Sequence, residues 1–293
     1  MIRKLAFMKS TGVKEKGITV YREISSKEFN IGMEFNKEVG RYLRYMELYR
    51  MVEENFKDLA NEIDSKNTAF RSGQEVDPDE FFLQANRLLL NFLSISRTFI
   101  DHSSRKIKKD YGADSKQDKR FGEALSNKYD NSFAYRFFYK LRNYSQHCGM
   151  PFGIVSERFV KNKFNQELPK IEILFDRDSL LNQYDSWSVV KQDLLAKPKT
   201  FSINEYIIEY MVCIKEINTT LLEIIGDELF KKIDDFSKWY AEVRNQHKDN
   251  GTPLITEYKN LEESQKGHTS NLVEFKIDKI KDIMKVYGIK ASK

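Results

Sequence analysis

Three polar residues near the middle of the chain, Arg142, Asn143 and His147, have side chains suited to chemistry on a phosphodiester. An imidazole exchanges a proton near neutral pH. A guanidinium is permanently charged, and its forked donors fit the oxygens of a phosphate or of the pentavalent phosphorane formed during cleavage. An Asn side chain can fix an imidazole tautomer or hold a phosphate oxygen. The three residue types therefore predict a site that acts on, or binds, a phosphodiester.

The spacing of these residues places them together only if the segment around them is helical. On a helix Asn143 and His147 are neighbours on one face, and Arg142 lies at the edge of that face. Segment 133–148 has such a pattern, with a cap expected between Asp130 and Ser132 and a stop at Gly149-Met-Pro151. We expect an apolar arc of Phe133, Ala134, Phe137, Leu141, Tyr144 and Cys148, and a polar arc of Arg136, Tyr139, Lys140, Arg142, Asn143, Gln146 and His147.

The run Arg142-Asn-Tyr-Ser-Gln-His147 resembles the Arg-polar-x-x-x-His motif of the HEPN superfamily, helical proteins that include many prokaryotic endoribonuclease toxins and abortive-infection proteins. The resemblance covers about residues 28–150. It implies a metal-independent ribonuclease that works as a homodimer, with Arg142 and His147 as the catalytic pair and Asn143 as the polar residue of the motif. In one subgroup a nucleotidyltransferase modifies a Tyr two residues after the His. Gly149 stands at that position here, which argues against this regulation.

The expected reaction needs neither a metal nor a cofactor, because no carboxylate cluster or Cys/His set lies near the motif in the sequence. The 2′-hydroxyl of the RNA would attack the phosphorus, leaving a 2′,3′-cyclic phosphate and a 5′-hydroxyl. One group must accept the 2′-hydroxyl proton and another must protonate the leaving oxygen. Since one chain has a single His in this context, a homodimer with two copies of His147 is expected. The alternative is a non-catalytic module that binds nucleic acid or protein, with Arg142 and His147 on a solvated helix face.

A basic segment precedes the motif. Between residues 105 and 120 there are seven Lys and Arg residues and three Asp residues. We expect this segment, together with the rest of the polar arc, to bind the RNA backbone. The RNA-binding residues predicted in this way are Lys106, Lys108, Lys109, Lys119, Arg120, Arg136, Tyr139, Lys140 and Gln146. The alternative for the basic segment is a solvated helix end and loop.

The rest of the chain indicates how this helix is positioned. Gly and Pro together make up 18 of 293 residues, about half of average usage, which favours long helices over many short strands. The predicted class is mainly α (α+β): a HEPN-like antiparallel helical bundle with a small β hairpin or sheet and additional long helices. Long helices are expected over 26–66 with a cap at Ser26, 78–109 with a cap at Asp77, 133–148, and 202–245 with a Ser202/Glu205 capping box, and a final helix is expected to end at Val286. Strands are expected over 18–24, 152–160, 170–175 and 272–277, and short helices over 178–195.

Two regions are expected: a HEPN-like helical region with an N-terminal strand over residues 1–150, and a mixed α/β extension over 151–293 that can belong to the same compact unit. Two cysteines, the lack of a secretion signal and the lack of a long apolar stretch predict a cytoplasmic protein without disulfides or membrane spans. The expected partners are RNA, such as tRNA or mRNA, a second copy of the chain, and an antitoxin or nucleotidyltransferase. Gly-rich phosphate loops, nucleophile elbows and His-Glu-x-x-His zinc helices are missing from the sequence.

Overall fold

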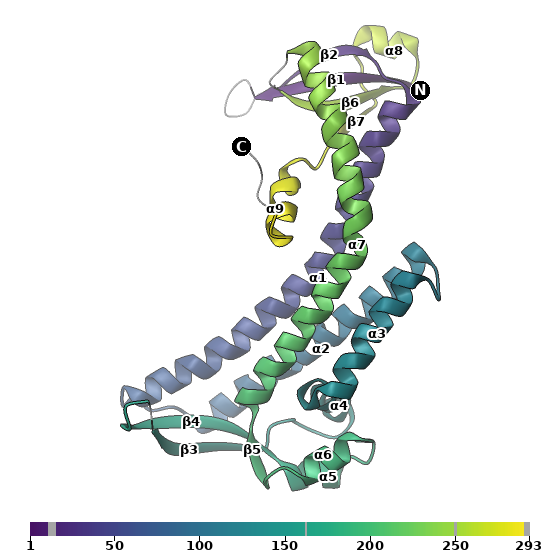
Figure 1. Ribbon diagram of the computed structural model, residues 1–293. Coiled ribbons are helices and arrows are strands. Elements are labelled where there is room, and N and C mark those ends of the chain that lie inside the picture. Colours follow the sequence, from purple (N-terminus) through teal and green to yellow (C-terminus); the bar gives the residue numbers. More distant parts are fainter. Residues whose placement is uncertain (11–15, 162, 249–250, 290–293) are drawn as a thin grey trace. The chain divides into compact units, whose positions relative to one another are not determined.

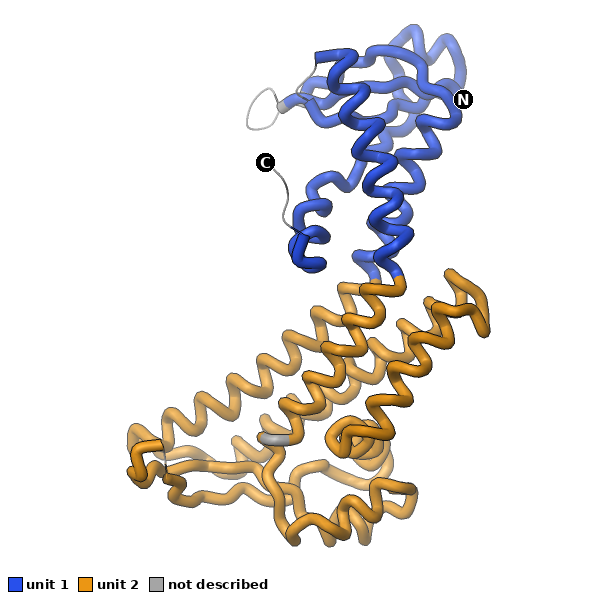
Figure 2. Tube along the Cα trace, viewed as in Figure 1, with its two compact units in different colours: residues 1–44, 225–293 blue, residues 45–224 orange. Residues whose placement is uncertain are grey.

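The computed structural model describes residues 1–10, 16–161, 163–248 and 251–289 (Figure 1). It is a mainly helical α+β structure with two small antiparallel sheets, as the composition predicts. The chain forms two compact units, one of residues 1–44 with 225–293 and one of residues 45–224 (Figure 2). The boundary expected at residue 150 lies inside the second unit. None of the helices in the described ranges has an apolar stretch long enough to cross a bilayer.

The first unit is built on a sheet of strand order β2-β1-β6-β7. Its strands are β1 (Ile2–Ser10), β2 (Lys16–Glu23), β6 (Thr252–Tyr258) and β7 (Asn271–Glu274), and the short helices α8 (Leu261–Lys266) and α9 (Asp278–Val286) belong to the same unit. Strands β2 and β7 and helix α9 fall close to their predicted positions. Strands β1 and β6 were not predicted. They lie at the centre of the sheet, and Leu5, Ala6 and Phe7 are all fully buried, so the alternation that marks a half-buried strand is missing.

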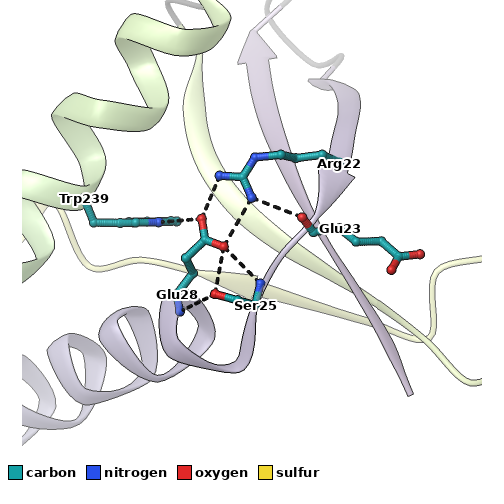
Figure 3. Close-up of polar contacts among 5 residues, drawn as sticks. All are labelled: Arg22, Glu23, Ser25, Glu28 and Trp239. Atoms are coloured by element: carbon teal, nitrogen blue, oxygen red, sulfur yellow. Dashed lines mark hydrogen bonds and ion pairs between the residues drawn. The ribbon is translucent and has the colours of Figure 1, made fainter.

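Helix α1 (Ser26–Arg71) begins at a network that joins three elements (Figure 3). Ser25 and Glu28 form a capping box: the Ser25 Oγ accepts from the Glu28 backbone N–H at 3.2 Å, and the Glu28 carboxylate accepts from the Ser25 N–H at 2.9 Å. Arg22 from β2 donates to both oxygens of that carboxylate, and Trp239 from α7 (Ile203–His247) donates to one of them. The expected cap at Ser26 is therefore wrong by one residue, because the hydroxyl that faces the helix start is that of Ser25.

The Glu28 carboxylate gives the first unit a pH-dependent contribution to stability. The Arg22 hydrogen bond, with the Ser25 and Trp239 donors, lowers its pKa to about 2. Because the pKa of Glu28 is lower in the folded chain than in the unfolded chain, the ionised carboxylate stabilises the fold at pH values above the usual carboxyl pKa. This stabilisation is lost as the pH falls from about 5 toward 2. We expect Glu28→Gln to lower the free energy of unfolding at pH 7 by about 1–2 kcal/mol. The effect is no larger because solvent screens the interactions of this partly exposed carboxylate.

Urea unfolding at pH 7 and pH 3 measures this effect. The difference in unfolding free energy between the wild type and Glu28→Gln should shrink at pH 3. At that pH the Glu28 carboxyl of the unfolded wild-type chain binds a proton more readily than that of the folded chain, which favours unfolding of the wild type. The matched control is Glu23→Gln, because the Glu23 side chain is exposed and points away from the network (Figure 3). Equal losses for both variants, or a difference that does not change with pH, would contradict the assignment.

The second unit contains the helices around the motif. Helix α2 (Pro78–Tyr111) begins as predicted, with the Asp77 side chain accepting from the N–H groups of Asp79 and Glu80. Helix α3 (Lys116–Asn131) was not predicted, since it has one fully buried side chain, Phe121, and so a weak apolar pattern. The remaining elements are α4 (Phe133–His147), the sheet of β3 (Ile154–Lys161), β4 (Glu167–Asp176) and β5 (Thr200–Ser202), and the short helices α5 (Arg177–Gln183) and α6 (Val190–Leu195).

The β3–β4 hairpin, the short helices α5 and α6, and the long helix α7 agree with the elements predicted from the sequence. Ser202 caps α7 through its Oγ, which accepts from the Asn204 N–H at 3.3 Å. The Glu205 side chain of the predicted capping box lies outside the described residues.

An aromatic core fixes α4 in the second unit. Phe137 is fully buried, and its ring contacts those of Phe133, Phe138, Phe175, Trp187 and Phe201. Two buried amides then position the chain that follows α4. The Asn86 Oδ1 accepts from the Phe152 N–H at 3.1 Å, and Asn67 exchanges hydrogen bonds with the backbone of Ile171. The sheet is thereby held against α1 and α2.

Candidate functional site

Helix α4 forms where the sequence predicts it and ends at the motif. The Ser132 Oγ accepts from the Tyr135 N–H at 3.1 Å, which caps its start. Near its end the Tyr144 hydroxyl donates to Gln183 of α5 at 2.6 Å. The buried side is wider than expected, because Tyr135 and Phe138 are buried too. Cys148, placed on the apolar arc from the sequence, is exposed, because the helix has already ended at His147.

The three motif residues lie together on the polar side of the last turns of α4. Arg142 and Asn143 are half-buried, and His147 is exposed. The Arg142 Nε is buried and has no hydrogen-bond partner among the described residues. Asn143 and His147 likewise have no side-chain hydrogen bond or ion pair within that part of the chain. The end of α4 is therefore fixed by its apolar side while the groups of the motif stay available to a ligand.

The other members of the polar arc differ in how they are engaged. The Arg136 guanidinium forms a two-pronged ion pair with Asp193 of α6, at 2.7 and 3.0 Å, and this hydrogen bonding raises its pKa. It also donates to the carbonyls of Tyr129 and Asp130, so its position is explained by the fold. Lys140 is half-buried and Gln146 is exposed, and neither side chain has a hydrogen bond or ion pair with the residues described.

The basic segment lies away from the motif. Lys106, Lys108 and Lys109 belong to the last turns of α2, whereas Asn86, which binds the chain just after α4, lies twenty residues earlier in the same helix. Along a helix that separation is about 30 Å. Lys119 is in the first turns of α3, at the end remote from α4. The structure thus separates the basic segment from the motif at the end of α4 instead of bringing the two together.

Two of the predicted basic residues already have partners within the second unit. The Lys106 ammonium lies 4.2 Å from the centre of the Tyr45 ring, and Arg120 forms an ion pair with Glu223. Lys108, Lys109 and Lys119 are exposed. These three remain as a small cationic surface at the α2–α3 turn.

A cleft of about 580 Å³ lies between α2, α3 and α4. On α4 it is lined by residues that are N-terminal to the motif. Tyr139 and Lys140, which the sequence predicts to bind RNA, line it together with residues that were not predicted: Arg97, Asp101, Tyr129, Asp130 and Tyr135. Arg97 and Asp101 form an ion pair at 2.9 Å one helical turn apart. Their spacing was visible in the sequence, but the cleft forms only where three helices meet.

Among the described residues, no group of three or more His, Cys, Asp or Glu side chains is arranged to hold a metal ion. Comparison of the chain with models of protein families, with curated proteins and with solved structures found no match. The HEPN resemblance therefore rests on the motif and on the helices around it, and it stays a prediction.

Proposed function

We propose that this protein is a metal-independent endoribonuclease whose active site contains Arg142, Asn143 and His147. One observation supports this most directly. The motif groups at the end of α4 have no partners among the described residues, although the same helix is fixed by a buried aromatic core and by the Arg136–Asp193 ion pair. A rigid element that presents an unengaged guanidinium, amide and imidazole is suited to binding and cleaving a phosphodiester.

The reaction proceeds by attack of the RNA 2′-oxygen on the adjacent phosphorus. His147 accepts the 2′-hydroxyl proton while the new P–O2′ bond forms. The P–O5′ bond breaks, and a second acid protonates the departing 5′-oxygen, so that the products are a 2′,3′-cyclic phosphate and a 5′-hydroxyl. Arg142 stabilises the added charge on the phosphorane oxygens, and Asn143 orients the imidazole or a phosphate oxygen.

A second copy of the chain provides the missing acid in this proposal. His147 is the only histidine of α4, and a homodimer that apposes two α4 helices places one imidazole as base and the other as acid. Lys140 and Gln146 contact the neighbouring RNA backbone, and Lys108, Lys109 and Lys119 attract more distant phosphates. Following the resemblance, the activity is that of a toxin or anti-phage effector, restrained by an antitoxin partner.

Incubation of the purified chain with total RNA and with a tRNA pool in excess EDTA tests the proposal. We expect cleavage to continue in EDTA, fragments to end in a 2′,3′-cyclic phosphate, and an oligonucleotide with a single 2′-deoxy substitution at the cleaved position to resist. Light scattering at the assay concentration should show a dimer.

Cleavage that stops in EDTA and returns with magnesium would contradict the mechanism. A fully active monomer would exclude the shared site. RNA binding without any cleavage would favour the interaction module instead.

A further inference from the structure

We propose that the cleft between α2, α3 and α4 binds one base of single-stranded RNA and prefers a base with an exocyclic amino group. The proposal rests on the proposed function in one respect, namely that RNA is the ligand of α4. It goes further by identifying the place where the protein distinguishes one nucleotide from another.

Tyr135 lines the cleft and carries a hydroxyl that is available to a ligand. Tyr135 is 3% exposed and lines the cleft, and burial raises the pKa of its phenol. Its hydroxyl forms no hydrogen bond with any residue in the described ranges. A hydroxyl without a protein partner can pair with a ligand atom without first breaking a bond inside the protein, so the ligand gains about the value of one hydrogen bond.

The walls of the cleft suit a flat ring. Tyr129 and Tyr139 meet edge to face with their ring centres 5.8 Å apart, and the Arg97 guanidinium lies 4.5 Å from the centre of the Tyr139 ring. Aromatic rings and a planar guanidinium are the surfaces on which unpaired bases stack. The cleft volume of about 580 Å³ leaves room for a nucleotide.

The carboxylates that line the cleft indicate which base is preferred. The Asp101 and Asp130 carboxylates are acceptors only, and they match the amino group of adenine, cytosine or guanine, which uracil lacks. Lys140, which also lines the cleft, is suited to the attached phosphate. From Tyr139 to His147 the chain advances eight residues along α4, about 12 Å. A base held in the cleft therefore belongs to a nucleotide close to the cleaved bond.

Calorimetric titration of the full chain with 5′-AMP, CMP, GMP and UMP tests this site without any cleavage. We expect saturable binding of at least one amino-bearing nucleotide, with UMP bound at least about tenfold more weakly. Tyr135→Phe should weaken that binding about fivefold, the value of one hydrogen bond. Because its hydroxyl has no protein partner, the same variant should keep the wild-type melting temperature.

Lys140→Met should weaken binding about tenfold at low salt and less at high salt. The matched control is Lys215→Met, since Lys215 is an exposed lysine of α7 in the same unit and does not line the cleft.

The outcomes separate this inference from the proposed function. Nucleotide binding that depends on Tyr135 and Lys140 supports the cleft even if the protein does not cleave RNA. The cleft assignment is overturned if no nucleotide binds, if UMP binds as well as the others, or if Lys215→Met weakens binding as much as Lys140→Met. Ribonuclease activity could persist in each of those cases.

Discussion

His147→Ala and Arg142→Ala should each reduce RNA cleavage by about 10²–10⁴-fold while leaving the fold intact. The first variant removes the group that transfers the proton, and the second removes the cation that stabilises the phosphorane. Neither side chain contributes to the buried core of α4, so the melting temperature should change little. Asn143→Ala should be milder, because the amide orients other groups and transfers no proton.

Rates on total RNA and far-ultraviolet circular dichroism of the same preparations measure these effects. The matched controls are His268→Ala and Arg50→Ala, which replace an exposed histidine of the first unit and an exposed arginine of α1. Both controls should keep wild-type activity. If either His147→Ala or Arg142→Ala cleaves RNA at the wild-type rate, the active site lies elsewhere in the chain.

The largest effect on stability is expected at an ion pair inside the first unit. On α1, the Glu38 carboxylate and the Arg41 guanidinium are 2.7 Å apart, with side chains only 4% and 9% exposed. Arg41 also lies 3.3 Å from Glu228. Arg41→Met leaves the Glu38 carboxylate buried without this counter-charge, and we expect the free energy of unfolding to fall by about 3–5 kcal/mol.

Chemical unfolding at pH 7 measures this loss, and the chain provides a close control. Lys57 and Glu54 have the same spacing in the same helix and the same 2.7 Å separation, but their side chains are 59% and 68% exposed. Lys57→Met should leave stability unchanged, because solvent screens an exposed pair. The double variant Glu38→Leu with Arg41→Met should recover much of the loss, since it removes both buried charges. Equal effects of Arg41→Met and Lys57→Met would show that burial is not the cause.

The sequence alone determines the features that depend on near neighbours in the chain. Asp77 before Pro78, and Ser132 before the apolar arc of α4, cap their helices through hydrogen bonds that span two or three residues, so both helix starts were predictable. The placement of Arg142, Asn143 and His147 on one side of a helix follows from the helical repeat. Activity and family membership were also inferred at this level, and they remain predictions.

Only the tertiary structure decides what each side chain faces. Arg136 and Tyr139 occupy equivalent places on the polar arc in the sequence, yet one pairs with Asp193 of α6 and the other lines a cleft with Tyr129 of α3. Strands β1 and β6 pair across more than two hundred residues, and their buried central position removes the alternation that identifies a strand. Contacts of this kind depend on segments far apart in the chain, so no local pattern encodes them and only the packed fold defines the partners.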